Sequence, residues 1–264
     1  MRRLAGVSSA SMFEEELEFA NELADAAGEI GLSFFGTELR VKLKPDRTPV
    51  TEADLTIEAM VRERVRGRYP TDAILGEEAG LEGGSGRRWI VDPIDGTKNF
   101  TDGIQIWATL IALAVDGEPV LGVANAPAIE ERYEAVQGGT ARLNGTPIRV
   151  STADRVSRAF VTYGSARVLL DGPFAGVIGN LARDARRTRA FGDFWGHMLV
   201  ARGSADAMLE SELATWDFAA LKVIVEAAGG RVTTFEGGPL EHGGSVLSTN
   251  RVLHDEIVAR LKER

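Results

Sequence analysis

The sequence contains no cysteine, and this absence excludes several classes of protein. A chain without thiols has no disulfide framework, no thiolate metal site and no cysteine nucleophile. Long apolar runs are also missing: the longest, residues 106–115, is about half a membrane span, and the first residues lack the continuous apolar core of a secretory signal. We therefore expect no membrane partner and take the cytoplasm as the default location.

Positive charge is in short supply as well. The chain has 30 lysine and arginine residues against 39 aspartate and glutamate residues, which gives a net charge of -9. Binding to nucleic acid or to an anionic membrane needs clustered positive charge, so we expect neither partner. An acidic chain can still bind an anion if bound metal ions supply the positive charge.

The 264 residues are enough for one to two domains of about 150 residues each. Residues 1–11 are small and polar and are predicted to form a disordered leader, which makes Met12 an alternative start. Residues 12–150 are predicted to form an N-terminal α+β lobe with a large antiparallel sheet. Residues 151–264 are predicted to form a C-terminal α/β lobe, with the two lobes packed as one unit around a cleft.

Local patterns predict the elements of both lobes. Apolar residues at helical spacing predict a long helix over residues 13–35, and alternation predicts a strand over residues 39–43. Over residues 104–150, runs of alternating apolar and polar residues are separated by Asp116-Gly117 and Asn144-Gly145. This pattern is typical of an antiparallel sheet with tight hairpins. After about residue 151, strands alternate with helices, which favours a second sheet covered by helices.

The most informative stretch has the sequence WIVDPIDGTKNF over residues 89–100. An apolar strand leads into Asp92 and Asp95, and a Gly-Thr pair that can open a helix follows. Pro93 disfavours helix at the residue before it, and Gly96 allows close backbone approach, so we predict a rigid turn that carries ligands. Hard divalent cations prefer carboxylate and carbonyl oxygens, and free amides at a helix start can bind an anion beside them.

Two further acidic segments have ordinary explanations when each is taken alone. Glu77 and Glu78 follow an apolar strand, and adjacent glutamates are usually solvated. Asp217 lies at a predicted helix start, where N-capping is the simpler interpretation. Together with the signature stretch, however, these segments offer four carboxylates beside a phosphate-sized amide pocket.

These three segments, Glu77-Glu78, residues 92–97 (DPIDGT) and residues 216–220 (WDFAA), resemble in order and spacing the signature segments of the inositol monophosphatase family. The similarity covers the chain from Met12 onward. It implies an α+β fold, the layered αβαβα sandwich of the inositol monophosphatase and fructose bisphosphatase type. It also implies dependence on Mg²⁺, with two or three ions per active site, sensitivity to Li⁺ and a homodimer.

The resemblance also implies roles for individual residues. The implied metal ligands are four acids and one carbonyl: Glu77, Asp92, Ile94, Asp95 and Asp217. Asp92 would bridge two metal ions, an arrangement that suits phosphate monoester hydrolysis because one ion activates water and the other stabilises the leaving oxygen. Asp54 and Thr97 would orient and deprotonate the attacking water, with Glu77 also in the catalytic set. The amides of Gly96 and Thr97 would bind the phosphate.

The segment RAFGDFWGHM over residues 189–198 bears on the substrate. It departs from the small-residue segment of inositol monophosphatases and resembles that of the monofunctional histidinol-phosphatases of the same family. Histidinol phosphate carries an ammonium and an imidazole, so its pocket needs acids, and Asp193 and Glu210 are the candidates. An N-cap role is the alternative for Asp193. Trp195 is expected to pack in the core, and His197 to be a helix residue with a satisfied ring rather than a Mg²⁺ ligand.

We therefore predict a Mg²⁺-dependent phosphate monoester hydrolase that acts on histidinol phosphate, a small-molecule ester of histidine biosynthesis. An inositol-1-monophosphatase or a broad sugar-phosphate phosphatase is the alternative enzyme, since Glu210 suits either kind of substrate. A catalytically dead metal-binding homologue is a third interpretation, and it is disfavoured because every expected ligand is present.

Overall fold

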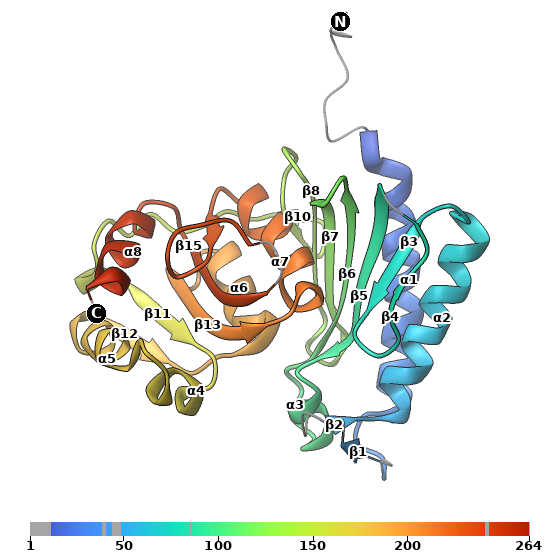
Figure 1. Ribbon diagram of the computed structural model, residues 1–264, viewed down its shortest axis with the longest axis horizontal. Coiled ribbons are helices and arrows are strands. Elements are labelled where there is room, and N and C mark those ends of the chain that lie inside the picture. The colour runs from blue at the N-terminus through green and yellow to red at the C-terminus, as the bar shows by residue number, and fades with distance from the viewer. Residues whose placement is uncertain (1–11, 39–40, 44–48, 85, 241–242, 264) are drawn as a thin grey trace, which may run out of the picture.

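The computed structural model describes residues 12–38, 41–43, 49–84, 86–240 and 243–263. Within these ranges two large sheets alternate with three layers of helices (Figure 1). The predicted leader over residues 1–11 lies outside the described residues, as do residues 39–40 of the strand predicted over 39–43. Within the remainder of that segment, β1 (Lys42–Leu43) pairs with β2 (Pro49–Val50) in a small sheet of its own.

The first large sheet has eight strands in the order β10-β9-β8-β7-β6-β5-β3-β4. Their bounds are β3 (Ala73–Gly76), β4 (Gly80–Glu82), β5 (Arg87–Asp95), β6 (Ala108–Val115), β7 (Glu118–Ala126), β8 (Glu131–Val136), β9 (Arg142–Leu143) and β10 (Thr146–Pro147). The β3–β5 pair is parallel, and the other neighbours are antiparallel. Asn144 and Gly145, with φ of 48° and 75°, form the predicted turn between β9 and β10.

Two helices, α1 (Glu14–Phe34) and α2 (Glu52–Arg68), cover one face of this sheet (Figure 1). On α1 the buried residues Ala20, Leu23, Ala24 and Ala27 recur at helical spacing and face the sheet, as the sequence pattern predicts. Helix α2 begins at a capping box, an arrangement in which the N-cap side chain and an acid three residues later each satisfy a free backbone N–H.

The second large sheet has five strands in the order β12-β11-β13-β15-β14. Their bounds are β11 (Phe160–Tyr163), β12 (Arg187–Arg189), β13 (Ala207–Leu213), β14 (Arg231–Thr233) and β15 (Gly244–Thr249). The outer face packs against α4 (Ala166–Asp171), α5 (Ala175–Asp184) and α8 (His254–Lys262). The sequence pattern did not predict the short helix α4.

Helices α6 (Asp193–Ala201) and α7 (Thr215–Ala227) form the middle layer between the two sheets (Figure 1). Helix α7 packs closely on β7: a Cβ at Gly122 would lie 2.4 Å from the carbonyl oxygen of Ala220. The short α3 (Thr97–Thr101) follows β5. The layers thus confirm the predicted αβαβα sandwich of the α+β class. Among the described residues, no helix has both the length and the apolar character that a membrane span requires.

Candidate active site

Strand β5 carries the first two acids of the site. It continues to Asp95, and its pairing with β6 shifts register between Asp92 and Asp95. The prediction of a rigid turn here was therefore wrong: Pro93 lies within an irregular part of the strand, where a missing backbone N–H is tolerated. Residues three apart on a regular strand point to opposite faces, so the irregularity is what allows both carboxylates to join one group.

One carboxylate oxygen from each of Asp92, Asp95 and Asp217 lies within 4.8 Å of the other two. Backbone groups at helix starts hold two of these side chains. Asp95 Oδ2 accepts from Phe194 N of α6 at 2.6 Å, and Asp217 Oδ2 accepts from Ala214 N at 2.6 Å. Ala214, not Asp217, is the N-cap residue of α7, so the N-cap interpretation of Asp217 was wrong. Asp217 is the third residue of the helix, and its bond from the N-cap N–H fixes it beside the other two acids.

Glu77 and Ile94 lie in the same cavity as these three acids. Glu77, directly after β3, hydrogen-bonds with the side chain of Asp92. The Ile94 carbonyl accepts from Thr97 Oγ1 at 2.9 Å, which leaves its second lone pair for another partner. The structure thus places all five predicted metal ligands around one space, together with Gly96 and Thr97.

The electrostatics of this group favour a bound cation. Burial, and then repulsion from Glu77, Asp95 and Asp217, raises the pKa of Asp92 well above its usual value. Burial also raises the pKa of Asp217 to about 7, against the lowering effect of its Ala214 hydrogen bond. Asp92 Oδ1 is buried without a hydrogen-bond partner among the described residues. Carboxylate and carbonyl oxygens are the ligands that Mg²⁺ prefers, so the residues present fit a divalent metal.

Asp54 lies fully buried at the start of α2, beside this group rather than in the wall of the cavity. Thr51 N donates to Asp54 Oδ2 at 2.8 Å, while Oδ1 has no partner among the described residues. Burial foremost, and also the charge of Glu77, raises its pKa to about 6. The Thr97 hydroxyl donates to Ile94 rather than to Asp54. Joint action of Asp54 and Thr97 on water therefore stays a prediction.

The cavity has a volume of about 690 Å³ and extends from the metal group to residues of the second sheet and α6. Asp193 lies in its wall with a φ of 55°, and Asp193 Oδ2 accepts from Asn99 Nδ2 at 3.2 Å. Gly192, not Asp193, is the N-cap residue of α6, so the N-cap alternative for Asp193 was wrong. Burial and then repulsion from Glu210 raise the pKa of Asp193 to about 6, and Lys98 opposes this shift.

Aromatic side chains and a second acid complete this end of the cavity. Glu210 lies on β13, 8% exposed. Trp195 lines the cavity and packs edge-on against Phe191, with ring centroids 4.9 Å apart. Trp195 also packs against the core between the two sheets, as expected from the sequence. Asn99 was not predicted as a site residue: it stands inside the signature stretch, but no local pattern shows that its amide reaches a residue 94 positions away.

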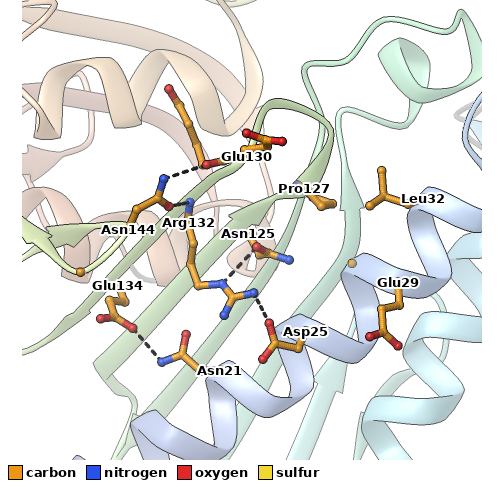
Figure 2. Close-up of a pocket in the computed structure, with 13 residues that line it drawn as sticks. Asn21, Asp25, Glu29, Leu32, Asn125, Pro127, Glu130, Arg132, Glu134 and Asn144 are labelled. Atoms are coloured by element: carbon orange, nitrogen blue, oxygen red, sulfur yellow. Dashed lines mark hydrogen bonds and ion pairs between the residues drawn. The ribbon is translucent and has the colours of Figure 1, made fainter.

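A second cavity, also of about 690 Å³, lies between α1 and strands β7 and β8 (Figure 2). Its polar groups bind one another: Arg132 pairs with Asp25 and donates to Asn125 Oδ1 at 3.1 Å, and Asn21 Nδ2 donates to Glu134 at 2.7 Å (Figure 2). Among the described residues, the one cluster of acids close enough to share a metal ion is at the first cavity. The two cavities have the same volume, so the cluster of acids, rather than the volume, identifies the first cavity as the candidate active site.

Known proteins resemble this chain over most of its length. The model of the inositol monophosphatase family matches residues 12–264. A histidinol-phosphatase of Mycobacterium tuberculosis is 42% identical over 95% of this chain and 99% of its own, and one of Streptomyces coelicolor is 41% identical over 95% and 98%. The structure of an IMPase from Thermotoga maritima superposes with a TM-score of 0.86 at 32% identity, covering 94% of this chain and 97% of that one. The chain therefore belongs to the inositol monophosphatase family of metal-dependent phosphate monoester hydrolases.

Proposed function

We propose that the protein hydrolyses histidinol phosphate with Mg²⁺ as its cofactor. One observation carries the proposal: a single cavity has an oxygen-ligand group at one end and two acids beside an aromatic ring at the other. The first end suits a phosphate, and the second suits a cationic, aromatic leaving group. Inositol presents only hydroxyl groups and would leave this second end without a charged partner.

At the phosphate end the protein's own groups bind and orient. The backbone amides of Gly96 and Thr97, at the start of α3, are assigned to the phosphate oxygens. When bound, Mg²⁺ ions neutralise the surrounding carboxylates and supply the positive charge that activates water and stabilises the leaving oxygen. Glu77, Asp92, Asp95, Asp217 and the Ile94 carbonyl are assigned to hold them.

Asp54 is assigned to remove the proton of the attacking water, with Thr97 orienting that water. A general base works best when its pKa is near the working pH, and burial places that of Asp54 at about 6. Two hydrogen bonds from Thr51 fix one carboxylate oxygen of Asp54, so the other oxygen keeps a defined direction.

At the leaving-group end, Asp193 and Glu210 are assigned to the ammonium and imidazole N–H groups of the substrate. Hydrogen bonds between ionised partners are about twice as strong as neutral ones. The ring of Trp195 offers a face against which a cation or an imidazole can pack. The histidinol-phosphatase relatives in the preceding subsection support the same substrate.

The direct test compares kcat/KM for histidinol phosphate and for inositol 1-phosphate, with Mg²⁺ present and after thorough chelation. We expect a preference for histidinol phosphate that needs Mg²⁺. A preference for inositol 1-phosphate or for sugar phosphates would favour the alternative enzyme, and weak hydrolysis of every ester despite bound metal would favour a dead homologue. The Asp193→Asn variant should lower the ratio of kcat/KM for histidinol phosphate to kcat/KM for inositol 1-phosphate. The Asp206→Asn variant, which changes a buried acid outside the cavity, should leave this ratio unchanged.

The finer properties rest on the resemblance and are proposed with the activity. They are two or three Mg²⁺ ions per site, inhibition by Li⁺, a homodimer and a cytoplasmic location. The division into lobes over residues 12–150 and 151–264 likewise stays a prediction. Mass measurement in solution and metal analysis of the purified protein test the dimer and the metal count.

A further inference from the structure

His197 is a buried histidine that the proposed reaction leaves without a role. It lies on α6, 1% exposed, against strands β13 and β15 of the second sheet. Its Nδ1 is 2.8 Å from Ser248 Oγ, and its Nε2 is 3.5 Å from Glu210 Oε2. Neither Nε2 nor Oε2 has a hydrogen-bond partner within the described part of the chain, so the two unpartnered atoms face each other.

The partner at Nδ1 indicates where the ring proton lies. The Ser248 side chain is 1% exposed, and its described hydrogen bond is the one to His197. A buried hydroxyl needs an acceptor for its proton, and Nδ1 is the acceptor at hand. The neutral ring then carries its proton on Nε2, directed at the Glu210 carboxylate. A shift of about 0.5 Å would bring the pair to ordinary hydrogen-bond distance.

The other oxygen of Glu210 is fixed from the opposite side. Asp193 N donates to Glu210 Oε1 at 3.4 Å. A Cβ at Gly164 would lie 2.1 Å from that oxygen, and one at Gly192 would lie 3.4 Å from it. The carboxylate therefore occupies space that two glycines leave open, between the first residue of α6 and the ring of His197.

We propose that His197 is a positioning residue, which holds Glu210 in the orientation that binds the cationic leaving group. This inference rests on the proposed function. Residues four apart on a helix share one face, so α6 carries both Asp193 and the anchor of Glu210. A glutamate side chain loses rotational freedom when it binds a ligand, and prior fixing reduces that loss. Helix α6 thus sets the geometry of both acids at the leaving-group end.

The test measures kcat and KM for histidinol phosphate and for p-nitrophenyl phosphate, an ester whose leaving group carries no positive charge. His197→Phe retains a ring but removes both nitrogens, and we expect the KM for histidinol phosphate to rise about tenfold with little change in kcat. His197→Gln restores a donor and should recover most of the loss. Ser248→Ala, which removes only the hydroxyl, should change KM in the same direction and serves if His197→Phe does not fold.

His254→Phe is the matched control. His254 is also fully buried, and its ring nitrogens bond Thr233 and Thr249 away from the cavity. This variant should lower Tm without changing the preference between the two esters. If His197→Phe likewise lowers Tm and affects both esters equally, His197 is merely structural and the inference is overturned.

A double variant tests whether His197 acts through Glu210. With Glu210→Gln already present, adding His197→Phe should raise the KM for histidinol phosphate no further, because the group being positioned is gone. Additive effects would overturn the inference. Assays of the wild-type enzyme distinguish failure of the proposed function from failure of the positioning role. No preference for histidinol phosphate in the wild-type enzyme would reject the proposed function and this inference with it. A wild-type preference that His197→Phe retains would reject the positioning role alone.

Discussion

Replacing Asp92 with asparagine should lower activity and raise the stability of the metal-free protein. Burial and three neighbouring carboxylates raise the pKa of Asp92 well above the usual 3.8. In the unfolded chain the carboxyl has a pKa of 3.8, so protonating it at about pH 7.5 costs about 5 kcal/mol. The free-energy cost of holding the charged carboxylate in the folded protein cannot exceed this value, because the group would then bind a proton instead. Asparagine has the same shape without this cost. A gain of only about 1 kcal/mol would raise Tm by roughly 2–4 °C.

The assay combines thermal unfolding in chelator with initial rates in Mg²⁺. Asp92 is proposed to hold the metal ions, so loss of its charge should lower kcat at least about 100-fold, since metal charge contributes several kcal/mol to the transition state. Asp206→Asn is the control: its carboxylate accepts from Phe160 N at 2.6 Å and from Ser151, so that variant should lose stability and retain activity. Near wild-type turnover of Asp92→Asn, or a lower Tm than wild type in chelator, would refute the reasoning.

Three further outcomes are expected. Gly164→Ala places a Cβ 2.1 Å from Glu210 Oε1, so it should displace that carboxylate and raise the KM for histidinol phosphate; an unchanged KM in steady-state assays would count against a role for Glu210. The pKa of Asp54 is raised from 3.8 to about 6, so the folded state binds the extra proton and the contribution of Asp54 to stability in chelator should fall by about 3 kcal/mol as pH rises through that window. Urea unfolding at several pH values should show a loss of stability over this window that is about 3 kcal/mol smaller in Asp54→Asn than in wild type, because Asp193 and Asp217 titrate in both proteins. Chelation should abolish hydrolysis and added Mg²⁺ should restore it; activity that survives chelation would contradict the metal assignment.

Local patterns in the sequence predicted much of the fold because they depend on near neighbours. The helical spacing of Ala20, Leu23 and Ala27 predicted α1, and Asn144-Gly145 predicted a hairpin turn. The acidic segments predicted a shared group of carboxylates, and the structure brings Asp92, Asp95 and Asp217 together. The resemblance to the inositol monophosphatase family was needed to place Asp217 in this group, since Asp217 stands more than a hundred residues from the other two acids and local spacing does not relate them.

The remaining features depend on contacts between distant segments. Trp195 lines the cavity because α6 begins there and Phe191 packs beside it, and helical spacing alone does not distinguish that wall from the core. The irregular pairing of β5 with β6 at Pro93 replaced the predicted turn, because β6 provides a partner strand beyond the proline. The space for Glu210 beside Gly164 likewise follows from how β11 and β13 pair.

The most direct test of the central claim is an anomalous-scattering map from crystals of the wild-type protein soaked in Mn²⁺, which takes the same oxygen ligands as Mg²⁺. The account predicts strong peaks within coordination distance of Asp92, Asp95 and Asp217. Peaks at other sites, with none among these carboxylates, would contradict it.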